Sequence, residues 1–188
     1  KMGQPVSDKW GVDDGAIHYT GGRGGGDLVT DKEYGDFELE VDWKIAEGGN
    51  SGIIYHVHED PQYKATYNTG PEMQVLDNER HPDAKQGRDG NRTAGAIYDL
   101  QKPVTPMAAK PAGEWNKARL VISKGKAEHY LNGKKVVEGV RTARLLEGWA
   151  NTHGLDLPIV SAVARVLRGE VAVQDALWEV MERRPKVE

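Results

Sequence analysis

The chain has 188 residues, a formal net charge of -4 and no cysteine, and 38% of its residues are hydrophobic. This length is enough for one well-buried domain with a small appendage. The composition excludes disulfides, thiolate metal sites and a cysteine nucleophile. A negative net charge gives no reason to expect nucleic acid as a partner, and no apolar run approaches the roughly 20 residues of a membrane-spanning helix.

Two segments with different patterns meet near residue 139. All but three of the 23 glycines precede residue 141. Residues 141–188 carry equal numbers of acidic and basic side chains, so the net charge belongs to the first segment. We therefore expect a β domain over residues 1–139 and a helical tail over residues 140–188.

The first segment alternates apolar and polar residues, as half-buried antiparallel strands do. The alternation is clearest over residues 37–45, and further short strands are expected at 53–58, 72–76, 95–100, 118–123, 127–131 and 134–138. Asn132-Gly133 joins the last two, and Asn-Gly between two such runs predicts a hairpin with a type I′ turn. Many short strands with abundant glycine indicate a mainly β fold, a sandwich or jelly roll.

The second segment repeats apolar residues every three or four positions, which is typical of amphipathic helices. The repeats cover residues 142–150, 158–168 and 173–183, and Gly154 and Gly169 stand where helices end. We expect about three short helices in the tail.

Two further stretches are expected to be loops. Residues 21–26 are almost all glycine, but they lack the preceding strand and following helix that a dinucleotide-binding fingerprint requires. Residues 79–92 are rich in charge, Gly and Pro, which predicts a mobile surface loop.

Six motifs in the first segment resemble one family in their order and spacing. They are 36–37 (DF), 49–53 (GNSGI), 69–77 (TGPEMQVLD), 98–100 (YDL), 110–116 (KPAGEWN) and 129–133 (HYLNG). The family is that of the 3-keto-disaccharide hydrolases, whose domain is a lectin/glucanase-like jelly roll, and the resemblance covers about residues 10–138. Tyr130 stands where the family commonly has Trp. The family's closing strands, with their Gln-Asp-His-Gly motif, have no counterpart here, so the resemblance implies a truncated sandwich.

The tail resembles a different family, the extreme C-terminus of NAD-dependent glycerol-3-phosphate dehydrogenase. The shared residues include 153–154 (HG), 157–160 (LPIV), 176–177 (AL), Met181 and 184–185 (RP). Val136 and Glu138 occupy positions that touch the cofactor in that family, and residues 136–139 (VVEG) suit both families. We therefore interpret the sequence as chimeric. Dehydrogenase activity is not expected, because the chain has no Gly-x-Gly-x-x-Gly strand–turn–helix unit.

The first resemblance implies a 3-keto-glycoside as the carbohydrate substrate and favours a periplasmic or extracellular location. A ketone at C3 acidifies the C2 proton, so a base can remove that proton and the aglycone can leave from C1. Such a site needs a carboxylate or His as base, a polarising group for the enolate oxygen and aromatic walls for the sugar. Two alternatives stay open: a non-catalytic carbohydrate-binding module on the same concave face, and an inactive hybrid.

Three residues are candidates for the chemistry. Glu72 and Gln74 share a strand face because they are two residues apart, and the resemblance places this stretch on the sugar-binding surface. Glu72 is the first candidate for the base and Asp77 the second, with a polar solvent-facing edge as the alternative. His129 is a candidate acid or, equally, an ordinary cross-strand partner.

The remaining candidates are residues that would contact the sugar or a cation. Asn50, Tyr55, His56, Gln74 and Tyr98 are the candidate substrate ligands, although Asn50 also suits a turn and both tyrosines also suit the core. His56 and His58 are two apart on an expected strand, and such a pair beside carboxylates is an acceptable arrangement for a divalent cation, with two solvent-facing histidines as the alternative. Apart from such a cation, the sequence leaves the cofactor unknown.

Overall fold

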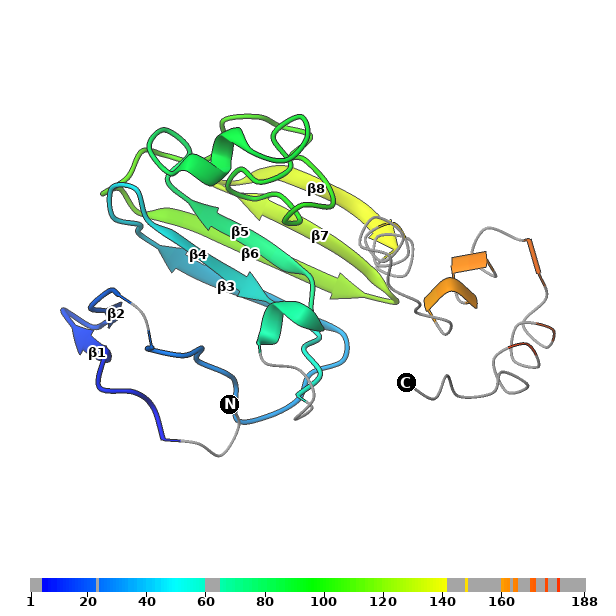
Figure 1. Cartoon of the computed structure of the whole chain (residues 1–188), viewed down its shortest axis with the longest axis horizontal. Helices are drawn as coiled ribbons and strands as arrows, with labels where there is room; N and C mark the ends of the chain where they lie inside the picture. The colour runs from blue at the N-terminus through cyan, green and yellow to red at the C-terminus, as the bar shows by residue number, and fades with distance from the viewer. Residues whose placement is uncertain are drawn as a thin grey trace, which may run out of the picture.

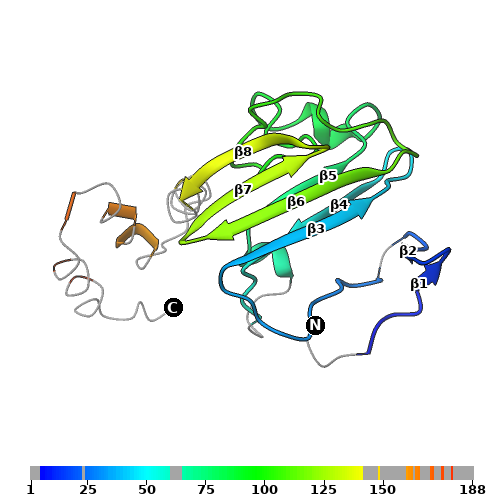
Figure 2. The same cartoon turned by 180° about the vertical axis from the view of Figure 1, so that it is seen from behind.

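The computed structural model describes residues 5–22, 24–59 and 65–141 continuously, and beyond them only residues 148, 160–162, 164–165, 170–171, 175 and 179. Figures 1 and 2 show two β-sheets lying face to face, with a small hairpin apart from them. The strands are β1 (Trp10–Asp13), β2 (Ala16–Tyr19), β3 (Phe37–Trp43), β4 (Asn50–Ile54), β5 (Glu72–Leu76), β6 (Asn116–Ser123), β7 (Lys126–Leu131) and β8 (Lys134–Arg141), and two 3-10 turns are η1 (Thr66–Asn68) and η2 (Pro82–Lys85).

The larger sheet has the order β3-β6-β7-β8 and is antiparallel throughout. Alternate residues of β6 are buried, as the period of two requires when one face meets the core and the other meets solvent. The smaller sheet pairs β4 with β5, and β1 pairs with β2 in the separate hairpin.

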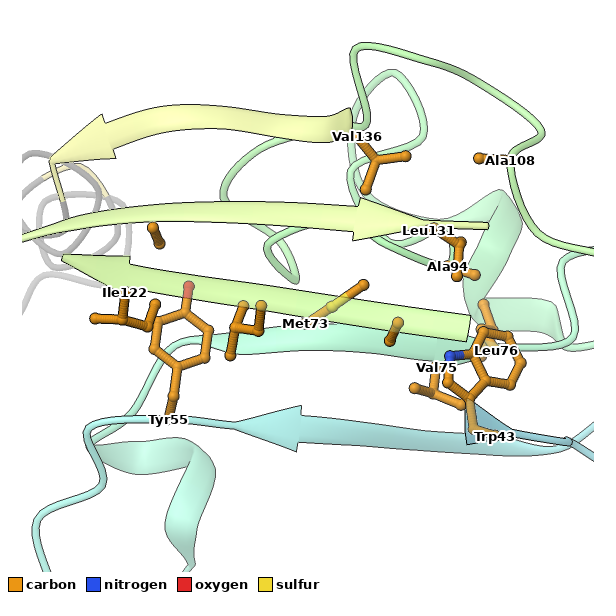
Figure 3. Close-up of a cluster of buried hydrophobic side chains, with 13 residues drawn as sticks. Trp43, Tyr55, Met73, Val75, Leu76, Ala94, Ala108, Ile122, Leu131 and Val136 are labelled. Carbon is orange, nitrogen blue, oxygen red and sulfur yellow. The ribbon is translucent and has the colours of Figure 1, made fainter. Parts of the chain in front are cut away.

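The hydrophobic core lies between the two sheets (Figure 3). Met73 and Val75 project from β5 toward the larger sheet, where Leu120, Ile122 and Leu131 are almost completely buried. Burial of such side chains stabilises a fold by about 1.5–3 kcal/mol each. The predicted sandwich is therefore confirmed, with a core that places β5 opposite the centre of the larger sheet.

Several predicted strands are confirmed and others are wrong. The hairpin β7–β8 turns at Asn132 and Gly133, whose φ angles are 51° and 77°, as a type I′ turn requires. Strand β4 starts at Asn50 and ends at Ile54, so most of the expected strand at 53–58 lies outside it. Strand β8 continues past the expected domain boundary at residue 139 and ends at Arg141.

Residues 95–100 do not form the expected strand; they form a loop whose backbone hydrogen-bonds to the edge of β5. Gly95 N donates to Gln74 O at 2.8 Å, Gln74 N donates to Ala96 O at 3.1 Å, and Tyr98 N donates to Glu72 O at 2.9 Å. Ile97 bridges both Met73 and Gln101, so the segment reverses direction after one short contact. It follows β5 on the edge that β4 leaves free.

The tail residues that the structure describes agree with the expected helices. Residues 148, 160–162, 164–165, 175 and 179 are helical, each inside one of the three predicted ranges, and 170–171 form a bend. The lengths of these helices and their packing lie outside the described residues. Across the described part of the chain, no helix is long and apolar enough to cross a membrane.

Candidate active site

Glu72 opens strand β5 and is half-buried. It pairs with Ile54 of β4, and Gln74 pairs with Gly52, so these four residues share one face of the small sheet. A Cβ atom built at position 52 would lie only 1.7 Å from Glu72 Oε1. The carboxyl group of Glu72 therefore lies directly over the backbone of β4, in space that is open only because residue 52 is glycine.

This location raises the pKa of Glu72 to about 7. Burial is the largest cause, because it withdraws water from the charged form, and the negative charges of Asp27 and Asp83 add to it. A carboxyl group that titrates near neutral pH can accept a proton there and return it, which is what a general base must do.

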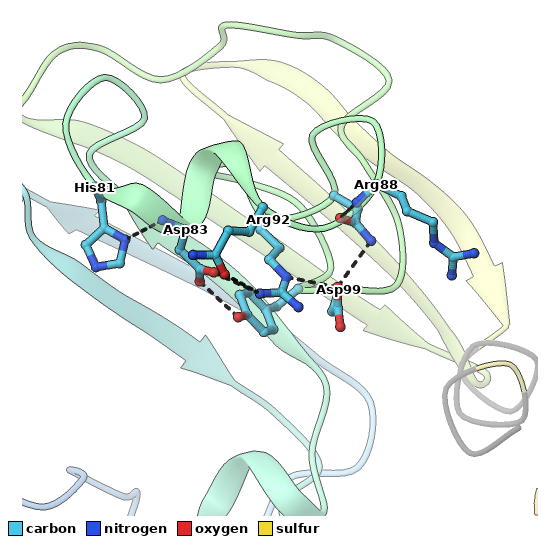
Figure 4. Close-up of polar contacts among 8 residues, drawn as sticks. His81, Asp83, Arg88, Arg92 and Asp99 are labelled. Atoms are coloured by element: carbon cyan, nitrogen blue, oxygen red, sulfur yellow. Dashed lines mark hydrogen bonds and ion pairs between the residues drawn. The ribbon is translucent and has the colours of Figure 1, made fainter. Parts of the chain in front are cut away.

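Asp83, Arg92 and Tyr98 form a polar cluster in the loop that follows β5 (Figure 4). Tyr98 Oη donates to Asp83 Oδ2 and Arg92 Nη1 donates to Asp83 Oδ1, each at 2.9 Å. Arg92 Nε also donates to Asp99 Oδ1 at 2.9 Å, and its guanidinium lies 5.2 Å from the centre of the Tyr98 ring. One arginine thus joins two carboxylates and an aromatic ring.

The cluster is fixed to Glu72 through the backbone, because Tyr98 N donates to Glu72 O. Burial, followed by the hydrogen bond to Asp83, raises the pKa of Tyr98 to about 12. Its hydroxyl proton is directed at Asp83, so the oxygen lone pairs remain as acceptors for a hydroxyl donor. Of the residues that we predicted from sequence, Glu72 and Tyr98 are the two that the fold brings together here.

Asp27 reaches the same end of β5 from the N-terminal segment. Its Oδ2 atom accepts a hydrogen bond of 2.8 Å from Thr66 Oγ1, at the start of η1. Asp27 and Asp83, from separate parts of the sequence, thus both raise the pKa of Glu72.

Asp77 lies at the other end of β5 and holds a turn. Its Oδ2 accepts from Gly48 N at 2.7 Å, and its Oδ1 accepts from Glu79 N and Arg80 N. The hydrogen bond from Gly48 is the largest cause that lowers its pKa. Both carboxylate oxygens of Asp77 therefore serve the turn, and its catalytic role stays a prediction.

His129 is fully buried in the core, far from solvent, and links the two sheets. Its Nδ1 is 3.1 Å from Gly95 O, which can only accept, so Nδ1 carries the proton and Nε2 accepts from Tyr55 Oη at 3.2 Å. Burial lowers the pKa of His129 to about 4 and raises that of Tyr55. His129 and Tyr55 thus contact each other in the core, as the alternative of a structural partner expects, and their roles as acid and sugar ligand stay predictions.

His56 and His58 do not share a strand face, because β4 ends at Ile54 and His56 adopts φ of 52°. His56 Nε2 is 3.0 Å from Gly35 O, and His58 N donates to Thr69 Oγ1. The prediction that they share a strand face, on which the metal-site hypothesis depended, is therefore wrong. Within the residues that the structure describes, no three His, Asp or Glu side chains are grouped so that they could hold a metal ion.

Asn50 and Gln74 also lie apart from the cluster around Glu72. Asn50 is exposed and pairs with Leu76, four residues along β4 from Ile54, which corresponds to about 13 Å. Gln74 shares the face of Glu72 as predicted, but it is only 1% exposed and its Oε1 accepts from Val75 N. Neither side chain is placed to contact the same ligand group as Glu72.

Sequence reasoning missed Gly52, Asp83 and Arg92. Gly52 falls between the expected strands at 37–45 and 53–58, and the other two fall in the stretch expected to be a mobile loop. That stretch contains η2 and the bonds of Arg92, which tie it together internally. The sequence shows a pair of opposite charges nine residues apart within a glycine-rich segment. Such a pair does not predict that the two side chains form an ion pair or lie near Glu72.

The model of the 3-keto-alpha-glucoside-1,2-lyase-like domain matches residues 2–176. The chain belongs to the 3-keto-alpha-glucoside-1,2-lyase-like domain family. Within this family it is 42% identical over 148 residues to a 3-keto-disaccharide hydrolase of Bacteroides thetaiotaomicron, which covers 71% of this chain and 51% of that protein. The chain thus spans about half the length of that relative.

A solved structure supports the sandwich fold. A crystal structure of a candidate glycosyl hydrolase from Parabacteroides distasonis ATCC 8503 superposes with a TM-score of 0.60 at 39% identity, covering 70% of this chain and 61% of that one. The second resemblance is found as well: a glycerol-3-phosphate dehydrogenase of Deinococcus radiodurans is 44% identical over 81 residues, covering 43% of this chain and 24% of that protein. A chimeric sequence accounts for both matches.

Proposed function

We propose that the sandwich cleaves 3-keto-glycosides, with Glu72 as the base that removes the C2 proton. The observation that supports this most strongly is the half-buried carboxyl group of Glu72, whose pKa is raised to about 7. The family to which the chain belongs, and its similarity to a 3-keto-disaccharide hydrolase, support this substrate class.

In the first step the Glu72 carboxylate takes the C2 proton, and the C–H electron pair forms an enolate with the C3 oxygen. In the second step the ketone re-forms, a double bond appears between C1 and C2, and the C1–O bond breaks with its electron pair on the aglycone oxygen. That oxygen takes a proton, which protonated Glu72 can return. Addition of water across C1 and C2 then completes a net hydrolysis.

Tyr98 is the proposed sugar ligand beside the base. Its hydroxyl proton is held by Asp83, so its oxygen accepts from a sugar hydroxyl while its ring offers one face to the substrate. The other face is covered by the guanidinium of Arg92. Arg92 forms an ion pair with both Asp83 and Asp99. These ion pairs hold Asp83 in place, and Asp83 in turn fixes the orientation of Tyr98.

A carbohydrate-binding module is the second candidate, and one observation favours it. Asp77 and His129, which were expected to join Glu72 in catalysis, lie at the far end of β5 and in the core. A single carboxyl group with a raised pKa is sufficient for proton abstraction, but it is also compatible with sugar binding without catalysis.

The test is release of aglycone from a chromogenic 3-keto-glucoside, measured with and without added Mn²⁺ or Ca²⁺. We expect release by the unmodified chain and a loss of at least about 100-fold in Glu72→Gln, in the range that general-base catalysis contributes. Glu40→Gln, a change at an exposed strand glutamate on β3, is the matched control and should keep full activity. Sugar binding without release from either protein would favour the binding module.

A further inference from the structure

A notch in strand β4 holds the side chain of Glu72. Gly52 is the diagonal neighbour of Glu72 across the β4–β5 pair, since Gly52 pairs with Gln74 and Ile54 with Glu72. Diagonal neighbours on one face are within reach of long side chains. Here the Glu72 side chain passes over Gly52 itself instead of extending away from the sheet.

The closest contacts that a side chain at position 52 would make are all with Glu72. The three heavy atoms nearest to a Cβ at that position are Oε1 at 1.7 Å, Cδ at 2.5 Å and Cγ at 2.6 Å, all of Glu72. Because Cγ is among them, rotation of the carboxyl group alone does not remove the overlap, and Glu72 must change rotamer. The backbone of Gly52 is outside the left-handed region, so alanine is compatible with its conformation.

We propose that Gly52 is the positioning residue of the base: its missing side chain is what seats the Glu72 carboxyl group against the sheet, within range of Asp27 and Asp83. This inference rests on the proposed function for its catalytic meaning. Its structural content, that residue 52 determines where the Glu72 carboxyl group lies, stands independently of activity.

A side chain at position 52 should lower the pKa of Glu72, because burial against the sheet is what chiefly raises it. A carboxyl group displaced from the sheet gains water, and the loss of burial, the largest cause of its raised pKa, favours its charged form. Gly52→Ala should therefore fold, keep Glu72, and yet lose both the raised proton affinity of that group and the alignment that proton abstraction needs. A purely structural glycine would change stability without changing the titration of one particular carboxyl group.

The experiment is an NMR titration of the Glu72 carboxyl carbon in the whole chain, assigned by its loss in Glu72→Gln. We expect the midpoint to fall in Gly52→Ala from about 7 toward the ordinary value near 4.5. The matched control is Gly11→Ala, a strand glycine with nothing within 4 Å of the added methyl group, which should leave the midpoint unchanged.

Two readouts separate this inference from the proposed function. If Gly52→Ala leaves the Glu72 midpoint unchanged, the inference is wrong whatever the activity. If the midpoint falls in a chain that never releases aglycone, Gly52 still positions Glu72 and the proposed function fails alone. In an active chain, Gly52→Ala should reduce kcat by about 100-fold, as expected for misplacement of a reacting group by about 1 Å, and Gly11→Ala should not.

Discussion

Glu72 combines two properties that oppose each other, a buried position and an ionisable group. Its folded-state pKa of about 7 lies above the value of 4.5 that it has when solvated, so the folded chain binds the proton more tightly than the unfolded chain. The contribution of Glu72 to the free energy of unfolding is therefore fully present below pH 4.5 and is lost as the pH rises through 7. If Glu72 is the base, as we propose, the site gives up stability near neutral pH in exchange for reactivity.

Replacement of Glu72 by its neutral isostere should therefore stabilise the chain at high pH while it removes activity. Glu72→Gln is expected to raise the free energy of unfolding at pH 8 by up to about 3 kcal/mol, from a shift of about 2.5 pKa units, and to change it little at pH 4.5. Urea unfolding at both pH values measures the difference, with Glu40→Gln as the control. An equal effect at the two pH values would show that Glu72 is not held in a protonation-sensitive place.

The strand pattern predicted that Glu72 and Gln74 share a face, but it did not predict the surroundings of Asp77 and His129. The alternation in β5 fixes which residues share a face, and that information is local. Asp77 and His129 carry the same functional groups as catalytic residues, yet one satisfies backbone N–H groups and the other lies between the sheets. Whether a carboxylate or imidazole is used by the backbone, the core or a ligand depends on tertiary contacts that a strand pattern does not contain.

The contact between Tyr55 and His129 joins the two sheets through one buried hydrogen bond. Tyr55→Phe keeps the ring but leaves His129 Nε2 without its donor, which should cost about 1–3 kcal/mol of unfolding free energy. Urea unfolding at pH 7 measures this cost. A change below about 0.3 kcal/mol would indicate that water or another group replaces the hydroxyl.

His129 should also make the chain sensitive to acid. Its folded pKa of about 4 lies below the solvated value of 6.5, so its contribution is complete above pH 6.5 and is lost as the pH falls toward 4. Unfolding measured from pH 7 to 4 in the Glu72→Gln background, where Glu72 does not titrate, should show this loss of stability. A flat profile in that background would contradict the assignment of a buried neutral imidazole.

At the level of elements, the β7–β8 hairpin depends on backbone conformation at its turn. Gly133 has a φ of 77°, and an L-residue in the left-handed region costs about 1–2 kcal/mol. Gly133→Ala should lose about this much unfolding free energy, whereas Gly11→Ala, on an ordinary strand backbone, should lose less. Equal losses in thermal or urea unfolding would contradict the type I′ assignment.

The elements differ in how far their sequence predicts them. Strand β5 and the Asn132-Gly133 turn were located correctly because period-two alternation and Asn-Gly are local signals. The segment at 95–98 has a strand-like composition but bonds only to the free edge of β5, and Ile97 then bridges Gln101. Hairpin β1–β2 was not predicted, since Val12 and Ile17 are paired but exposed and provide no buried face to detect.

At the scale of the whole molecule, the candidate site lies on the smaller sheet, formed by β4 and β5. The tail resembles a different family, glycerol-3-phosphate dehydrogenase. The smaller sheet is completed by the loop segment at 95–98, which also brings Tyr98 to Glu72. The residues that influence Glu72 come from positions 27, 52, 83 and 98. Only the folded sandwich assembles them, so the proposed activity requires an intact sandwich.

The most direct test of this account is exchange of deuterium from solvent into a 3-keto-glucoside, followed by NMR at C2 and C4. Both positions are acidified by the C3 ketone, so C4 serves as the internal reference for spontaneous exchange. We predict faster exchange at C2 alone, with a rate that rises with pH through about 7 as Glu72 ionises, and its loss in Glu72→Gln. Equal exchange at C2 and C4, or C2 exchange that survives Glu72→Gln, would contradict the assignment of Glu72 as the base.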